Sequence, residues 1–382
     1  MSRTLYLSRL RQLLTREGDS FFDALRSRHG WRPREVEIRL TWACNALCVM
    51  CGLDHYLKTS DTHYKKQVPV ERLLEVITEL ADSGCESILF SGGEVTLVKE
   101  LPNILAHTSK LGISSQINSH GGRLTEDYCD KLLDSGLNGI MISLDAADAE
   151  LHDSIRNLPG LFETAVKGVS YLRRKRPDQS NFYMLINTVI MKNNYRQLPD
   201  LVKLASESGI GEINFSPLSI DNTWDDWATG KVELKLSDAE EAELATEIFP
   251  KVMEIAKKGK ISVIIPAVIN SQGLIEIQKS LFNATWVNCA VAHYHCVINV
   301  NGDVFPCCYA SPQRFSMGNI MENSFTDIWN GEEYSKFRNN CFPAKFEMCV
   351  SCSQHRNENE LIQRWFDRQL KTRGEMSYEK HH

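Results

Sequence analysis

The sequence predicts an α/β protein with two parts, a large domain of parallel strands and a small cysteine-rich domain near the C-terminus. Between residues 35 and 217, six β-rich runs alternate with amphipathic helical segments, a pattern that produces parallel strands joined by right-handed crossovers. Seven of the twelve cysteines then fall between residues 289 and 352. Periodicity alone does not distinguish a barrel from an open doubly wound sheet, but both place functional residues after the carboxyl ends of strands.

The expected elements follow from the periodicity of apolar residues. Apolar side chains at helical spacing before Pro33 predict an N-terminal helical cap over residues 1–34, packed on the main domain, which covers 35–236. A helical connector over 237–288, a cysteine-rich domain over 289–355 and a tail helix over 356–382 are expected next. Within the main domain the expected strands are 36–40, 87–90, 113–117, 140–144, 182–191 and 212–215, and the expected helices are 70–83, 101–111, 126–135, 161–174 and 198–208.

The composition argues against several classes of partner. The formal net charge of −6 is mild, and the compact basic run at residues 173–176 ends a predicted helix before Pro177, so we expect no nucleic-acid partner. No apolar run reaches the length of a membrane span, and the first residues lack the apolar core of a secretory signal. Cysteines at this number without an export signal indicate metal ligation in a reducing cytoplasm.

Three cysteines, Cys44, Cys48 and Cys51, follow the first expected strand within eight residues. A loop this short brings three thiolates onto one metal or one cluster, and thiolates at this density select zinc or iron–sulfur. Three ligands leave one coordination position open for chemistry. The alternative is a zinc or plain iron–sulfur site completed by a distant His or Cys.

The Cys-x3-Cys-x2-Cys spacing after a first strand resembles the radical S-adenosylmethionine (SAM) superfamily. The resemblance implies a partial (β/α)6 barrel in which the three cysteines hold a [4Fe–4S] cluster and SAM chelates the fourth iron. It also implies a flavodoxin- or ferredoxin-type electron donor. Met50 stands where the superfamily usually has an aromatic residue, and a Met can pack against the adenine of SAM.

The loops after the second and third expected strands are similar to SAM-binding turns of this superfamily. Gly92, Gly93 and Glu94 resemble its GGE motif, whose backbone and glutamate bind the amino group of SAM. Two glycines at a strand end also let the backbone approach a ligand closely. In the polar turn that follows the third strand, Asn118 is the preferred cofactor contact.

Later loops supply further candidates. The resemblance assigns Ser143 and Arg156 to the ribose or carboxylate of SAM, and the alternative for Arg156 is a surface salt bridge. Asn187 interrupts an apolar strand, so it needs a partner in the barrel or contacts a ligand. Asp221 belongs to a loop rich in Asp and Trp that suits a polar substrate and makes it a candidate catalytic residue; an exposed loop with Asp as turn former is the alternative.

The second cysteine set surrounds a predicted hairpin, residues 297–300 and 304–305, turned by Asn301 and Gly302. It resembles the shortened SPASM or twitch domain, a small α+β domain in which four cysteines hold an auxiliary [4Fe–4S] cluster. A structural zinc ribbon is the alternative to the cluster, and Cys308 could replace Cys307 as a ligand. The implied ligands are Cys289, Cys307, Cys349 and Cys352.

Two remaining thiols, Cys296 and Cys341, are candidate catalytic residues because a thiol facing the substrate is a good hydrogen-atom donor. A core thiol is the default for both.

The resemblance implies an enzyme that reductively cleaves SAM to a 5′-deoxyadenosyl radical and abstracts hydrogen from a substrate carbon. We expect a small polar metabolite (a sugar, aminocyclitol or nucleotide-linked intermediate), because the N-terminal cap is too short for a leader-peptide-binding domain and the loop rich in Asp and Trp suits a polar substrate. With one auxiliary cluster, we expect the substrate radical to be oxidised by that cluster. The alternatives are a radical epimerase or peptide-modifying enzyme with a Cys hydrogen-atom donor and, from another class, a non-catalytic metal-stapled binding protein.

Overall fold

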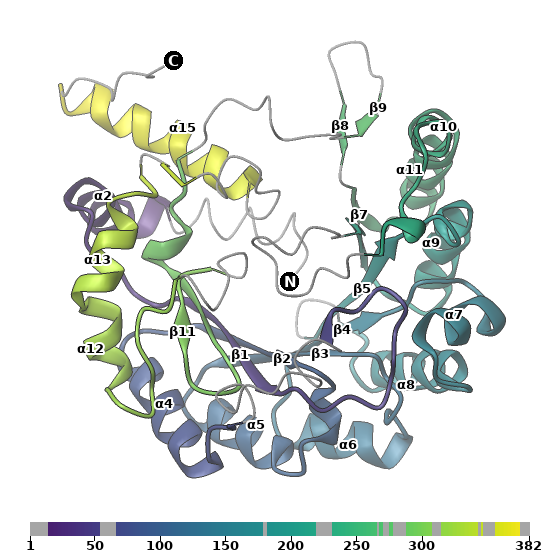
Figure 1. The fold of residues 1–382 in the computed structure, drawn as a ribbon, viewed down its shortest axis with the longest axis horizontal. Helices are drawn as coiled ribbons and strands as arrows, with labels where there is room; N and C mark the ends of the chain where they lie inside the picture. The colour runs from purple at the N-terminus through teal and green to yellow at the C-terminus, as the bar shows by residue number, and fades with distance from the viewer. Residues whose placement is uncertain are drawn as a thin grey trace.

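The strands form one curved sheet whose outer face is covered by helices, so that the ribbon traces an incomplete ring (Figure 1). The computed structural model describes residues 14–53, 66–178, 182–218, 231–265, 267–269, 275–277, 288–307, 315–342, 345–346 and 356–374. Within these ranges, nine strands pair in the order β11-β10-β1-β2-β3-β4-β5-β6-β7. All neighbours are parallel except β11, which is antiparallel to β10.

The elements of the ring have the following bounds. The strands are β1 (Glu35–Thr41), β2 (Ser87–Gly92), β3 (Ser114–Ser119), β4 (Gly139–Ser143), β5 (Tyr183–Ile190), β6 (Glu212–Pro217), β7 (Ser262–Ile264), β10 (His295–Ile298) and β11 (Val304–Phe305). The helices are α4 (Val70–Asp82), α5 (Leu101–Lys110), α6 (Glu126–Asp134), α7 (Ala149–Arg156), α8 (Leu161–Lys175), α9 (Leu198–Glu207), α10 (Asp238–Glu243), α11 (Phe249–Gly259), α12 (Phe325–Asn330) and α13 (Glu332–Arg338). A separate hairpin pairs β8 (Ala267–Ile269) with β9 (Ile275–Ile277).

The six expected strands are present as β1 to β6, with ends that differ from the prediction by two residues or fewer. The sheet is larger than expected, because β7 from the connector and β10 and β11 from the cysteine-rich segment join its two edges. An edge strand leaves backbone N–H and C=O groups without partners, and the added strands pair with them. The domain bounds predicted from the sequence remain a proposal, since both flanking segments share the sheet of the main domain.

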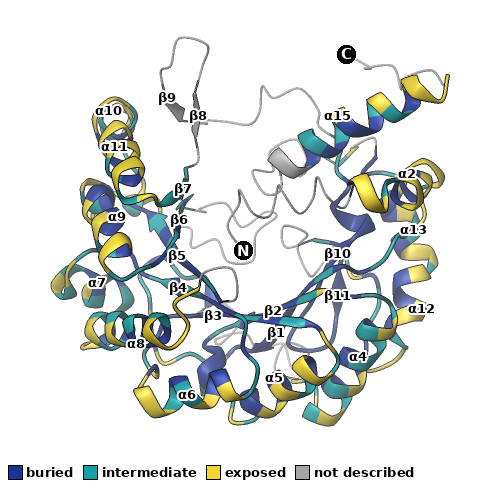
Figure 2. Cartoon of the chain, turned by 180° about the vertical axis from the view of Figure 1, so that it is seen from behind, coloured by how far each residue is buried: buried dark blue, intermediate teal, exposed yellow. Residues whose placement is uncertain are grey.

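The two faces of the sheet differ in chemistry because side chains alternate along each strand. Val36, Ile38 and Leu40 of β1 pack into the main core cluster together with Leu73 and Val76 of α4. The residues between them on β1 point to the inside of the curve and are polar or charged. Figure 2 shows the same division, with buried helix faces turned toward the sheet and exposed faces turned outward.

Helix α7 was not expected from the sequence. Its N-cap is Asp148, whose side chain accepts a hydrogen bond from the backbone N–H of Leu151 at 2.9 Å, and it ends at Asn157 in the left-handed conformation. Both are typical helix-end residues. The helix has only eight residues, and only His152 and Ile155 are buried, so its apolar residues were too few to predict a helix.

The two terminal helices pack against each other. Helix α2 (Gly18–Ser27) meets α15 (Arg356–Thr372), with the rings of Phe21 and Trp365 at 5.9 Å and those of Phe22 and Phe366 at 4.9 Å. Their shared cluster also contains Tyr294. The N-terminal helix therefore packs on α15 and the cysteine-rich segment, where the sequence led us to expect the main domain. No helix within the described ranges is long and apolar enough to cross a membrane.

Candidate functional site

The cysteine triplet lies in the loop that follows β1, at the carboxyl edge of the sheet. Cys44, Cys48 and Cys51 are half-buried and form no disulfide. Cys44 and Cys51 pack beside Trp42, whereas Cys48 packs in a different cluster with Met50. The backbone N–H of Cys51 donates to the carbonyl of Cys48 at 3.1 Å. The loop is therefore anchored on two sides.

Electrostatics show that these thiols lie near one another. The pKa of Cys44 is raised to about 11, mainly by burial and also by the neighbouring charges of Cys48, Glu94 and Cys51. Such a thiol stays protonated near neutral pH unless a metal binds its sulfur, and coordination to a metal displaces the proton to water. This chemistry fits an iron–sulfur cluster held by the triplet.

The loop after β2 lies directly against the cysteine loop. Gly93 donates its backbone N–H to the carbonyl of Thr41 at 2.6 Å, and Glu94 donates to the carbonyl of Ala43 at 2.8 Å. A Cβ at Gly92, whose φ is +129°, would lie 2.4 Å from the oxygen of Thr41, and one at Gly93 would lie 2.3 Å from the oxygen of Ala43. Both glycines are thus needed because two backbone segments meet here. From the sequence we had expected these glycines to let the backbone approach a ligand.

Glu94 is fully buried and its carboxylate is surrounded by donors from its own chain. Oε1 accepts from the backbone N–H and the hydroxyl of Thr96, at 3.0 and 2.6 Å, and from the hydroxyl of Ser119 at 2.8 Å. Oε2 accepts from the backbone N–H of His120 at 2.9 Å. The carboxylate therefore joins the loops after β2 and β3, and its contact with the amino group of SAM remains a prediction.

His120 is a site residue that we missed from the sequence. Its Nε2 lies 2.9 Å from Oδ1 of Asn45, in the cysteine loop, and 3.3 Å from Oε2 of Glu94. Burial lowers the pKa of His120, although Glu94 opposes the shift. The signal was available, because His120 follows Asn118 in the same polar turn.

Polar side chains from four strands line the inner face of the sheet. Ser143, Asn187 and Asn214 occupy one row across β4, β5 and β6, and Nδ2 of Asn214 donates to Oδ1 of Asn187 at 3.1 Å. On β3, Oδ1 of Asn118 is buried and has no hydrogen-bond partner among the described residues. A buried acceptor without a donor is costly. A donor on a bound cofactor or substrate would remove this cost, so the inner face fits a polar ligand.

Arg156 reaches the cysteine triplet from the end of α7. Its Nη2 lies 2.6 Å from Oδ2 of Asp145, which is fully buried, and its Nη1 donates to Sγ of Cys48 at 3.7 Å. Burial raises the pKa of Asp145, and Arg156 opposes the shift. A surface salt bridge, the alternative that the sequence left open, is wrong. The structure brings Arg156 to the triplet, and its contact with SAM remains a prediction.

Two of the predicted auxiliary ligands, Cys289 and Cys307, lie where the main core cluster meets the cluster of the terminal helices. Both are half-buried and free of disulfides, which suits thiolates at the rim of a cluster. Four predicted residues lie outside the described residues: Cys308, Cys349, Cys352 and Asp221.

Cys296 and Cys341 lie in the main core cluster. Cys296 is in register with Val36, which faces the helices, and burial raises its pKa well above the ordinary value. Their positions favour the core-thiol alternative, because a hydrogen donor must face the substrate. The donor role remains a prediction that no observation supports.

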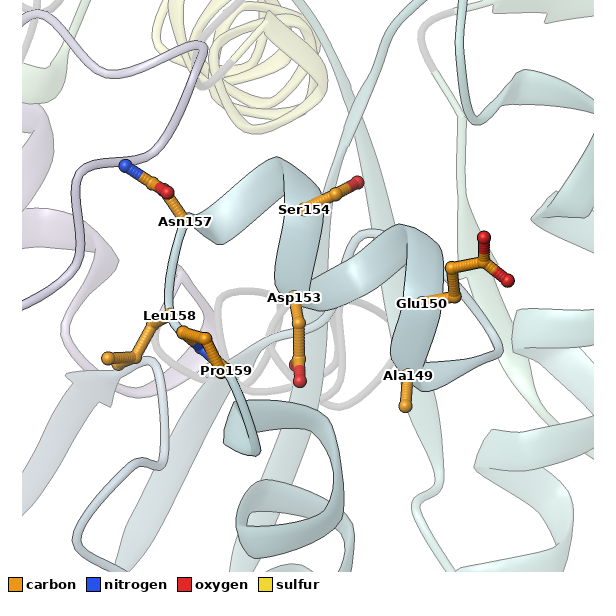
Figure 3. Close-up of a pocket in the computed structure, with 7 residues that line it drawn as sticks. All are labelled: Ala149, Glu150, Asp153, Ser154, Asn157, Leu158 and Pro159. Carbon is orange, nitrogen blue, oxygen red and sulfur yellow. The ribbon is translucent and has the colours of Figure 1, made fainter.

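A cavity of about 360 Å³ lies on the outer surface of α7 and does not coincide with the cysteines (Figure 3). Glu150, Asp153 and Asn157 are among the residues that line it, whereas Arg156 bonds to Asp145 and Cys48. The carboxylate of Asp153 already accepts from the backbone N–H groups of Gly160 and Phe162. This cavity is therefore a surface hollow of the α7–α8 turn.

Comparisons with known proteins agree with this geometry. Residues 38–205 match the family model of the radical SAM superfamily, and residues 289–353 match that of the SPASM iron–sulfur cluster-binding domain. The chain is 26% identical over 318 residues to the AdoMet-dependent heme synthase of Methanosarcina barkeri, covering 80% of this chain and 85% of that protein. It is 25% identical over 323 residues to the mycofactocin maturase MftC of Mycolicibacterium smegmatis, covering 82% and 74%.

Solved structures share the fold. SuiB of Streptococcus suis bound to S-adenosylmethionine superposes with a TM-score of 0.62 at 19% identity, covering 90% of this chain and 76% of that one. The anSMEcpe structure with bound AdoMet has a TM-score of 0.59 at 16% identity, covering 89% and 97%. The two domains imply a SAM-binding cluster and an auxiliary iron–sulfur cluster. The chain belongs to the radical SAM superfamily and carries a C-terminal SPASM domain.

Proposed function

We propose that this radical SAM enzyme abstracts a hydrogen atom from a carbon of a small polar metabolite and ends in oxidation of the substrate through the auxiliary cluster. When bound, SAM and the two clusters supply a carbon-centred radical and an electron acceptor. The observation that carries the proposal is the charged pair on the inner face of β1, where Nε of Arg39 lies 3.2 Å from Oε1 of Glu37, because the other polar groups named on this face are assigned to SAM. Such a lining would bind hydroxyl or amine groups.

A charged group extends this lining on β1 and β2. Oε1 of Glu37 accepts from the hydroxyl of Ser91 at 2.6 Å and from Nε of Arg39 at 3.2 Å. Burial raises the pKa of Glu37, but the charge of Arg39 and the bond from Ser91 outweigh it, and the net shift is downward. Glu37 therefore stays ionised, and together with Arg39 it offers one negative and one positive group to a substrate.

We assign the remaining roles as follows. Cys44, Cys48 and Cys51 hold the SAM-binding cluster, and Arg156 lies beside it. Gly92 and Gly93 bring the neighbouring loop against the cysteine loop and thereby limit the access of water. SAM contacts come from Met50, Glu94, Asn118, Ser143 and Asn187. Electrons enter from a flavodoxin- or ferredoxin-type donor in the cytoplasm.

A second candidate substrate class comes from the relatives. The heme synthase and MftC resemble this chain over four fifths of its length, and their names indicate a tetrapyrrole product and the maturation of a peptide-derived cofactor. Arg39 would suit a carboxylate on either kind of substrate, because an Arg fork binds a carboxylate with two hydrogen bonds.

The experiment is a deuterium-transfer assay with the anaerobically purified full chain, SAM and dithionite. Deuterated aminocyclitols, sugars, nucleotide sugars, iron-coproporphyrin and peptides are supplied singly, and 5′-deoxyadenosine is analysed for deuterium by mass spectrometry. Transfer from a polar metabolite is the expected result. Transfer only from the porphyrin or a peptide would replace our substrate class by the second one.

The control is Cys48→Ala, which removes one ligand of the SAM-binding cluster. SAM cleavage should be abolished, while the iron of the auxiliary cluster stays. Cleavage at the wild-type rate would contradict the assignment of the triplet, and a colourless wild-type protein that contains only zinc would support the metal-stapled binding protein.

A further inference from the structure

Helix α15 contacts a predicted ligand of the auxiliary cluster. Asn359, in the first turn of this helix, is 5% exposed, and its Nδ2 lies 3.5 Å from Sγ of Cys289. Its Oδ1 accepts from the backbone N–H of Ala290 at 2.8 Å. This second bond determines the orientation of the amide, because a backbone N–H can only donate and so must face the oxygen. The NH₂ group therefore faces the sulfur.

The helix is held firmly at this place. One turn after Asn359, Gln363 accepts a hydrogen bond through Oε1 from Nδ2 of Asn288 at 2.7 Å. Trp365 and Phe366 pack on α2 in the same cluster that includes Ala290. Because Asn288, Cys289 and Ala290 are consecutive, two side chains of α15 fix the position of the cysteine relative to the helix. The amide donor is thus preorganised and needs no rearrangement to face the sulfur.

A donor at this position acts on the charge of the cluster. One-electron reduction adds one negative charge, which spreads over the iron, the sulfides and the cysteine sulfurs. An N–H group that donates to a sulfur stabilises the more negative state more strongly, and hydrogen bonds to the sulfurs are among the determinants of cluster potential. Burial strengthens the effect, because a hydrogen bond in a low-dielectric environment is electrostatically stronger than one in water.

We propose that Asn359 is a positioning residue that raises the reduction potential of the auxiliary cluster by donating an N–H···S hydrogen bond to Cys289. The proposal rests on the proposed function, in which Cys289 is a cluster ligand and the cluster takes one electron from the substrate radical. A higher potential makes the cluster a better acceptor for that electron. The sequence offered no sign of this role, because Asn359 is seventy residues from Cys289.

The test uses the full chain with Cys44, Cys48 and Cys51 all changed to Ala, so that its EPR signal comes from the auxiliary cluster alone. After reconstitution with iron and sulfide, the midpoint potential is measured by EPR-monitored titration with dithionite. Asn359→Leu removes the donor and the acceptor. Asn359→Asp keeps an acceptor for Ala290 but replaces the donor by a negative oxygen. Both midpoints should move to more negative values, and that of the Asp variant should move further.

The matched control is Arg364→Gln, which removes the exposed ion pair with Glu360 on α15 without touching a sulfur or the residues beside Cys289, and its midpoint should stay at the parent value. A triple-Ala parent that binds no iron would refute the auxiliary ligand assignment, and with it the proposed function. A parent that binds iron and shares its midpoint with both Asn359 variants would overturn this inference alone. Loss of iron from both variants would also overturn it, by giving Asn359 a role in assembling the site.

Discussion

Glu94 allows a decisive test of whether a GGE glutamate serves the fold or the cofactor. Its buried carboxylate accepts from two backbone N–H groups, those of Thr96 and His120, and from the hydroxyls of Thr96 and Ser119. Hydroxyls can rotate to other acceptors, but the two backbone donors cannot. We compare two variants: Glu94→Gln keeps an oxygen at the position of Oε1, whereas Glu94→Ala keeps neither carboxylate oxygen.

The magnitude follows from the number of donors that lose their acceptor. A buried donor without a partner costs about 1–3 kcal/mol. In Glu94→Gln the new NH₂ group faces the N–H of His120, so this backbone donor loses its acceptor. The loop after β3 should then open about 2 kcal/mol more easily. In Glu94→Ala the N–H of Thr96 is lost as well, which gives about 4 kcal/mol. A cost of about 2 kcal/mol corresponds to about 30-fold faster exchange of the affected amides.

The assay is hydrogen–deuterium exchange, followed by mass spectrometry on peptides that contain Thr96 or His120, in the iron-free chain. Exchange at His120 should accelerate in the Gln variant, and exchange at both positions should accelerate in the Ala variant. Glu150→Gln changes an exposed glutamate of α7 and serves as the control. If Glu94→Gln exchanges as slowly as the wild type at His120, the fold does not need this acceptor, and our reasoning about the fold is refuted.

Two further predictions test the cysteine loop and one buried histidine, His293. In Gly93→Ala the new Cβ would meet the backbone oxygen of Ala43, so the cysteine loop should shift and the SAM-binding cluster should be lost. Iron analysis should then give about half of the wild-type iron, since each cluster holds four irons. Full iron with normal SAM cleavage would contradict the expected clash. Burial lowers the pKa of His293 from 6.5 to about 3, so between these values the unfolded chain binds a proton that the folded chain does not. Stability should therefore fall as the pH drops from about 6.5 toward 3, by up to about 1.4 kcal/mol per pH unit for this residue. In His293→Gln, which keeps a donor for the carbonyl of His29, urea unfolding of the iron-free chain at pH 7 and pH 5 should show a smaller loss, and an equal loss would refute the assignment.

Local sequence signals were enough to predict the central strands of the sheet and the cysteine loop that follows the first of them. The strands β1 to β6 were predictable because each is a short β-rich run bounded by turn residues, and such a pattern needs no knowledge of the partner strand. The triplet of Cys44, Cys48 and Cys51 was readable for the same reason, since its ligands lie within one loop. The SPASM domain was recognisable from the cysteine spacing between residues 289 and 352, whereas its four ligands stay a prediction.

Only the tertiary structure decided what meets across long distances in the chain. Sequence reasoning did not show that β7 and β10 extend the sheet, since strand pairing depends on edges that form only in the fold. Sequence reasoning did not decide whether Arg156 contacts a ligand or forms a surface salt bridge, because its partners Asp145 and Cys48 come from two other loops. The contact of Asn359 with Cys289 likewise exists only because packing of the terminal helices brings α15 there. Periodicity records which side of an element is apolar, whereas burial and pairing between distant segments decide which polar groups become neighbours.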